Sequence, residues 1–232
     1  MPQRISNIHP KPEVLFTTYG CREQPELAGL VMQTIEIWSR IDFTRTTLLA
    51  EFLKADFDVV HSMFNALTAD SAKRSVIKAA GRAALKDDNE GQSFFLAVMK
   101  FCDSEQKTRH KFAHWIWTTS PDLPDALVLV KPTMLVQAHF ELLDSVLTKP
   151  PGPLNIGPFE DIYIYTKIDL TGAISAAMDV LEVMTELPMA LLDWRADGGA
   201  RIARRRKLST RPRLQSILQN QSTQNGPEGQ PE

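Results

Sequence analysis

Residues 25–53 read PELAGLVMQTIEIWSRIDFTRTTLLAEFL, and this stretch decides the fold class. Proline suits the first turn of a helix, where its missing N–H would have no partner in any case. Apolar side chains then recur at helical spacing along the whole stretch, at Leu30, Ile37, Ile41, Leu48 and Phe52. We therefore predict one long helix over this range.

Helical spacing of apolar residues returns on the C-terminal side of this stretch. It predicts further helices over residues 57–67, 72–85, 91–117, 133–147 and 170–194. Asp103-Ser104 is expected to interrupt the third of them, because both residue types prefer helix caps to helix interiors. Short apolar or alternating runs at 126–130 and 161–166 predict two strands that pair with each other. The predicted fold class is mainly α, a helical bundle with a minor two-stranded β element.

The chain is predicted to have three parts. Residues 1–24 form an N-terminal extension with one short strand at 14–18, and residues 25–194 form the helical domain. Residues 195–232 are expected to be a disordered basic tail, because 13 of the last 18 residues are Gln, Asn, Ser, Gly or Pro. The tail carries eight Lys or Arg and three Asp or Glu, whereas residues 1–194 carry a net charge of −7.

Composition excludes several classes of protein. No run of about 18 apolar residues exists that would span a membrane, and the N-terminus lacks the apolar stretch of a secretory signal. Two distant cysteines, Cys21 and Cys102, exclude a disulfide scaffold and favour reduced thiols in the cytoplasm.

The strongest functional motif is Arg109-His110-Lys111-Phe112-Ala113-His114. Arginine presents a planar fork of donors that matches phosphate. Histidine exchanges protons near neutral pH. Together they supply what phosphodiester cleavage without a metal requires: a cation on the phosphoryl oxygens and a general acid or base.

Helix geometry leaves other interpretations open. Arg109 and His114 are five residues apart, about 140° around a helix, so they do not share a face. His110 and His114 do share a face, at the i, i+4 spacing that zinc-binding helices use. No third ligand lies at a spacing typical of a zinc site. We therefore predict no metal and no other cofactor. The structural alternative is a solvated Arg109 and Lys111 above a core of Phe112 and two tryptophans.

The Arg-polar-x(3)-His pattern of residues 109–114 resembles the motif of the HEPN superfamily, the higher-eukaryote and prokaryote nucleotide-binding domains. The order of helices before it is similar, as are the Trp after the histidine and the strand at 127–130. The nearest resemblance is to uncharacterised bacterial HEPN-like helical proteins. It covers residues 27–190 as a pattern.

The resemblance implies an HEPN-like bundle that acts as a metal-independent endoribonuclease or an RNA-binding relative, as in defence or toxin–antitoxin systems. His114 would move the proton of the 2′-hydroxyl or of the leaving oxygen, and Arg109 would hold the scissile phosphate. His110 would orient the pair, and Asp42 would support it unless it pairs with Arg45 or Arg40. The expected assembly is a homodimer through the motif helix, with RNA, and with an antitoxin or another protein, as partners.

The charge distribution places any general affinity for RNA on the tail, because backbone affinity comes mostly from cations. The candidate tail residues are Arg204, Arg205, Arg206 and Lys207. The alternative function, from another class, is a non-catalytic helical interaction module in which the Arg–His motif is structural.

Overall fold

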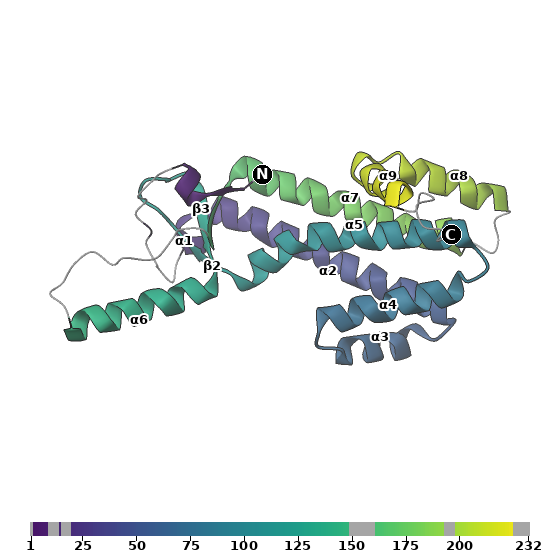
Figure 1. Cartoon of the computed structure of the whole chain (residues 1–232), viewed down its shortest axis with the longest axis horizontal. Helices are drawn as coiled ribbons and strands as arrows, with labels where there is room; N and C mark the ends of the chain where they lie inside the picture. The colour runs from purple at the N-terminus through teal and green to yellow at the C-terminus, as the bar shows by residue number, and fades with distance from the viewer. Residues whose placement is uncertain (1, 9–13, 15–19, 149–160, 193–197, 225–232) are drawn as a thin grey trace, which may run out of the picture. The chain divides into compact units, whose positions relative to one another are not determined.

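The computed structural model describes residues 2–8, 14, 20–148, 161–192 and 198–224. This part of the chain is mainly helical with a small antiparallel sheet, which confirms the predicted fold class (Figure 1). The α-helices are α1 (Gly20–Glu23), α2 (Pro25–Leu53), α3 (Phe57–Ala66), α4 (Asp70–Ala84), α5 (Asn89–His114), α6 (Pro132–Thr148), α7 (Lys167–Leu191), α8 (Gly198–Ser209) and α9 (Pro212–Gln224). The strands are β1 (Gln3–Arg4), β2 (Ile116–Thr118), β3 (Ala126–Val130) and β4 (Ile162–Thr166), and a 3-10 helix, η1, spans Ile5–Asn7.

The chain divides into two compact units. The first contains residues 1–36 and 107–176, and the second contains residues 37–106 and 177–232. Helices α2, α5 and α7 each contribute residues to both units. The motif residues 109–114 therefore belong to the first unit.

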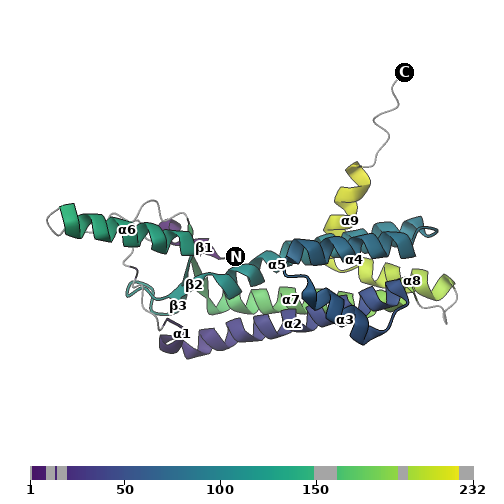
Figure 2. The ribbon, with the colours of Figure 1, turned by 90° about the horizontal axis from the view of Figure 1, so that it is seen from below.

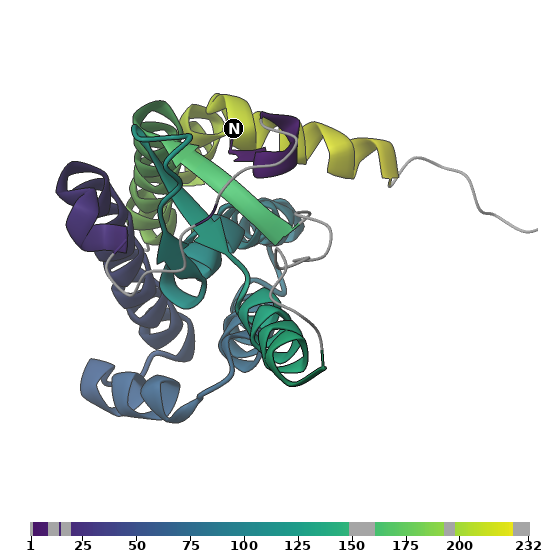
Figure 3. The same cartoon turned by 90° about the vertical axis from the view of Figure 1, so that its left-hand side faces the viewer.

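The first unit is built on the sheet, whose strand order is β1-β4-β3-β2. All its pairs are antiparallel, and Val128 lies opposite Ile164 in the pairing of β3 with β4. Successive side chains of a strand point to opposite faces, and both faces of this sheet are covered, which explains why every residue of β3 is buried. One face packs with Ile5 and Met134, and the other packs with helical residues such as Leu27 and Phe112. Figure 3 shows the strands of this sheet between helices of the same unit.

The sheet is larger than the sequence predicts. The pairing of the strands near 126–130 and 161–166 is confirmed, but β1 and β2 extend the sheet on either side. Val14 is not in a strand, and residues 15–18 of the predicted N-terminal strand lie outside the described residues. The N-terminal part of the chain contributes Gln3–Arg4 to the sheet instead.

A hydrogen bond joins the end of α5 to strand β2. The indole Nε1 of Trp117 donates to the carbonyl of Phe112 over 3.1 Å. The last carbonyls of a helix have no partner within the helix, so this bond satisfies one of them and turns the chain from helix into strand. The predicted helix over 91–117 therefore ends at His114.

The second unit has a core of helix-borne apolar side chains, including Trp38, Phe95 and Phe101. Helix α4 runs back beside the first part of α5, as Figure 2 shows. The two helices approach closely where a Cβ added to Gly81 would lie 2.3 Å from the ring of Phe95. The expected interruption at Asp103-Ser104 is wrong, because the Ser104 hydroxyl donates to the Phe101 carbonyl and α5 continues.

The prediction of a disordered tail is wrong for residues 198–220, which form α8 and most of α9. Leu208 and Leu214 are buried and belong to the same core as Trp38 and Phe95. Leu208 stands alone among arginines, so no apolar periodicity marks it in the sequence. Leu214 does stand at helical spacing from Ile217 and Leu218, which pack against the same core, but three apolar residues are a weak signal in a stretch rich in glutamine. Residues 225–232 lie outside the described residues.

None of the described helices combines the length and the apolar character that crossing a membrane requires.

Candidate functional site

Helix α5 carries the motif on its last turns. It runs without a break from Asn89 to His114, with Lys111 and His114 in the final turn. Cations at the C-terminal end of a helix are stabilised by its dipole. This electrostatic effect accounts for part of the charge pattern without any function, so the contacts of each side chain must decide what the motif does.

Arg109 has a half-buried side chain with no hydrogen-bond or ion-pair partner among the described residues. Its Nε atom is shielded from solvent and has no hydrogen-bond acceptor, and the guanidinium forms no ion pair with the part of the chain that the structure describes. Buried arginines of the second unit differ: Arg45 donates to Asp42 and Gln106, and Arg205 donates to Asp88. An arginine that is not paired with a carboxylate can use the planar donors of its guanidinium to bind another anion.

The structure brings His110 and His114 together. Both side chains are exposed, and their ring centroids lie 4.6 Å apart with the ring planes at 50°. Arg109 and His114 have no mutual contact, as expected from their separation of about 140° around an unbroken helix. The chain therefore presents a histidine pair and a separate unpaired arginine in adjacent turns.

A metal site is not assembled by the described residues of one chain. They contain no group of three or more His, Cys, Asp or Glu side chains placed to hold a metal ion. The pair of His110 and His114 offers two nitrogen ligands, whereas a zinc site uses three or four protein ligands.

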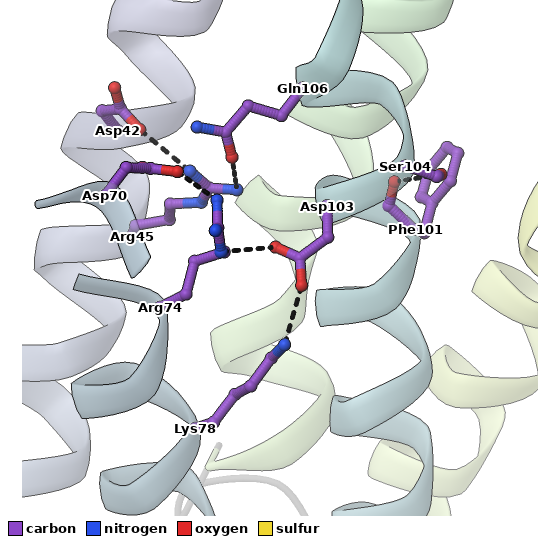
Figure 4. A network of polar contacts seen from close by, with 9 residues as sticks. All are labelled: Asp42, Arg45, Asp70, Arg74, Lys78, Phe101, Asp103, Ser104 and Gln106. Atoms are coloured by element: carbon purple, nitrogen blue, oxygen red, sulfur yellow. Dashed lines mark hydrogen bonds and ion pairs between the residues drawn. The ribbon is translucent and has the colours of Figure 1, made fainter. Parts of the chain in front are cut away.

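Asp42 belongs to the second unit and is engaged by the alternative partner that the sequence suggested. Its Oδ1 accepts a hydrogen bond of 3.0 Å from Nη1 of Arg45, whose side chain is only 2% exposed. Figure 4 shows this pair within a polar network of α2, α4 and α5. The network also contains the ion pair between Lys78 and Asp103, at 2.7 Å. These contacts give Asp42 a structural role.

The candidate RNA-binding residues of the tail lie on α8 and differ from one another. Arg205 is buried, donates through Nε to the Ala190 carbonyl over 3.0 Å and forms a two-pronged ion pair with Asp88. Lys207 lies 3.5 Å from a carboxylate oxygen of Glu186. Arg206 is exposed, so the four cations do not form one free basic surface.

Sequence reasoning missed one contact beside the motif. The ammonium of Lys111 lies 3.9 Å from the ring centroid of Tyr163 and 5.2 Å from that of Trp115. Tyr163 comes from β4, about 50 residues away in the chain, so only the strand pairing places it there. The alternation of residues 161–166 predicts a strand but not which face carries a functional side chain.

The charge around the motif is locally positive. Residues 106–121 contain three Lys or Arg, two His and no Asp or Glu. Carboxylates lie at both edges of this stretch: Glu105 precedes it in α5, and the Glu23 carboxylate accepts a hydrogen bond of 2.9 Å from the Thr119 hydroxyl just after β2.

Comparison with models of known protein families, with curated proteins and with solved structures finds no match to this chain.

Proposed function

We propose that this protein cleaves RNA without a metal ion, at sites that form when two copies pair through the C-terminal part of α5. His114 moves the proton, Arg109 binds the scissile phosphate, and His110 orients its histidine neighbour. The observation that carries the proposal is the half-buried guanidinium of Arg109, which has no carboxylate partner among the described residues.

The reaction uses only groups that the chain supplies. The ribose 2′-oxygen attacks phosphorus, so that a bond from O2′ to phosphorus forms and the bond from phosphorus to O5′ breaks. The His114 imidazole of the site takes the 2′-hydroxyl proton, and the imidazolium so formed gives a proton to the leaving O5′. The products are a 2′,3′-cyclic phosphate and a 5′-hydroxyl. Arg109 stabilises the negative charge that develops on the phosphoryl oxygens.

The geometry of α5 supports a dimer. Because the helix is unbroken, Arg109 and His114 of one chain point in different directions. A two-fold axis beside the helix would place Arg109 of one copy near His114 of the other, in two equivalent sites. Such a composite site needs no distortion of the helix.

The alternative, a non-catalytic interaction module, requires that Arg109 and His114 be satisfied within the chain. The exposure of His114 and the missing partner of Arg109 support the catalytic proposal instead. Both functions share the same fold, so they are separated by activity.

The first experiment incubates the full-length protein with total RNA in EDTA. We expect cleavage by the native protein and none by Arg109→Ala or His114→Ala. His139→Ala and Arg82→Ala are matched controls, because both replace exposed residues outside the motif, and both should cleave normally. Equal cleavage by native protein and His114→Ala would contradict the proposal. Activity that EDTA abolishes and zinc restores would favour a metal site at His110 and His114.

The second experiment tests the composite site. Arg109→Ala and His114→Ala are each inactive, but a mixed dimer holds one site with an intact Arg109 from one copy and an intact His114 from the other. Unfolding and refolding the two variants together should therefore restore part of the activity. No restoration, with mixed dimers demonstrated by mass spectrometry, would place both residues of a site in one chain.

A further inference from the structure

The cluster of Lys111, Trp115 and Tyr163 lies directly beside the motif. The ring centroids of Trp115 and Tyr163 are 5.7 Å apart, with the planes at 56°. The Lys111 ammonium lies over both rings. All three side chains are half-buried, so the two aromatic side chains keep part of their surface in contact with solvent.

The neighbouring aromatic residues, in contrast, take part in core packing. Tyr165 is 1% exposed and belongs to the apolar cluster on one face of the sheet. Trp117 packs against Phe112 and donates its indole N–H to the Phe112 carbonyl. Trp115 and Tyr163 have no such hydrogen bond in the described structure, and Trp115 follows His114 immediately in the chain. A ligand held on Trp115 is therefore held next to His114.

The charge of the same region selects the class of ligand. Residues 106–121 contain cations and histidines without a carboxylate of their own. The Glu23 carboxylate that contacts this stretch is bound to the Thr119 hydroxyl, so the cations beside the two rings favour an anionic ligand. Aromatic side chains next to cations are the usual means of binding single-stranded nucleic acid, because each unpaired base offers a flat face and each phosphate a negative charge.

We propose that Trp115 and Tyr163 bind an unpaired base of single-stranded RNA, and that Lys111 binds the phosphate beside it. The inference rests on the proposed function and adds its substrate class, because it places the stacked base next to the phosphate that Arg109 and His114 act on. The flexible stem of Lys111 lets its ammonium leave the rings for the phosphate. Bases inside a duplex are already stacked on one another, so duplex RNA is a poor ligand for this surface.

Binding is measured apart from cleavage, with every variant made in the full-length His114→Ala chain. A fluorescent uridine-rich oligonucleotide is titrated with protein in EDTA and its anisotropy is recorded. We expect the added Trp115→Ala change to weaken binding about tenfold, the loss typical of one stacked base. Phe140→Ala is the matched control, since Phe140 is an exposed aromatic residue of the same unit, 65% exposed, and it should bind normally.

Two further ligands test stacking without changing an aromatic residue. An oligonucleotide of the same length with abasic sites keeps the phosphates and should bind about tenfold more weakly. A blunt duplex of the same sequence should also bind weakly. Because these arms use an intact Trp115, they remain decisive if Trp115→Ala does not fold, and Trp115→Phe should restore binding.

The outcomes separate this inference from the proposed cleavage. Binding that depends on bases and on Trp115, by a protein that does not cleave RNA, supports the stacking surface and contradicts the nuclease. The native protein could instead cleave RNA and bind normal and abasic oligonucleotides equally well. This result would overturn the stacking surface but would remain consistent with the proposed nuclease activity. Tighter binding of the duplex than of the single strand also overturns it.

Discussion

Arg205 of α8 and Asp88, which precedes α5, form a two-pronged ion pair across 117 residues of sequence. The Arg205 side chain is 6% exposed and the Asp88 side chain 34% exposed. Asp88 also accepts a hydrogen bond of 2.8 Å from the backbone N–H of Gly91 and so caps the first turn of α5. One carboxylate therefore stabilises a helix start and anchors the C-terminal helices.

We expect Arg205→Ala to lower the free energy of unfolding by about 2 kcal/mol, below the range for fully buried pairs because Asp88 is partly hydrated. Urea denaturation followed by circular dichroism measures this change. Lys207→Ala is the control, since the Lys207 side chain is 72% exposed in its pair with Glu186, and pairs of exposed side chains contribute less than about 1 kcal/mol. Equal losses in the two variants would show that burial of Arg205 does not matter.

Stability should fall in acid through Asp88. The hydrogen bond from Arg205 lowers the pKa of the Asp88 carboxyl below its ordinary value, which is about 3.9. The contribution is thus complete above about pH 4 and is lost as the pH falls through the depressed pKa. Asp88→Asn should be less stable at neutral pH and should lose less stability on acidification. Urea denaturation at a series of pH values measures the free energy of unfolding of both proteins. Curves of this free energy against pH that run parallel would contradict the assignment.

Two helical glycines should respond oppositely to alanine. A Cβ on Gly81 would lie 2.3 Å from the Phe95 ring, whereas a Cβ on Gly29 would meet nothing within 4 Å. Gly81→Ala should destabilise the protein by about 1–3 kcal/mol through overpacking. Gly29→Ala should stabilise it by about 0.5–1 kcal/mol through helix propensity. A thermal shift of the same sign in both variants would rule out the close packing at Gly81.

The two cysteines should differ in reactivity. Burial raises the pKa of the Cys102 thiol to about 11 and keeps it from solvent. Partial burial also raises the pKa of Cys21, but the Cys21 side chain is exposed to reagents. Because the thiolate is the nucleophile, iodoacetamide at neutral pH should modify Cys21 alone in the folded protein. Peptide mass spectrometry measures the sites, and the denatured chain, modified at both, is the control. Modification of Cys102 without denaturation would contradict its burial.

Arg109→Lys tests whether the guanidinium fork matters beyond its charge. Lysine keeps the positive charge but not the planar pair of donors. We expect about tenfold slower RNA cleavage by Arg109→Lys, against no detectable cleavage by Arg109→Ala, in single-turnover assays with a labelled oligonucleotide. Arg82→Lys should have no effect. A native rate for Arg109→Lys would reduce the role of Arg109 to a point charge.

The long helices could be predicted from sequence because their apolar residues repeat over many turns. Helix α2 begins and ends at the predicted residues, 25 and 53. Strand β2 could not be predicted, because its apolar residues extend the pattern of α5 and only the hydrogen bond of Trp117 shows where the helix ends. Strand β1 has two residues, too few for any periodicity.

The candidate site was predictable in its residues but not in their surroundings. The motif contains Arg109 and His114, and the i, i+3 spacing suggested the pair of Asp42 with Arg45, but no sequence pattern indicates that Arg109 lacks a carboxylate partner among the described residues. Tyr163 reaches the motif only through strand pairing. From sequence alone, Arg205 would be interpreted as a solvated charge, because its partner, Asp88, is distant in sequence.

Because α8 and α9 pack on the core of the second unit, a shortened chain would lose part of that core as well as its C-terminal charges. A premature stop at residue 197 would remove Leu208 and Leu214 from the core of the second unit and leave apolar side chains facing water. It would also leave the Asp88 carboxylate without its guanidinium. The lesion would therefore act through misfolding, proteolysis and low abundance, and not through the loss of a dispensable basic appendage.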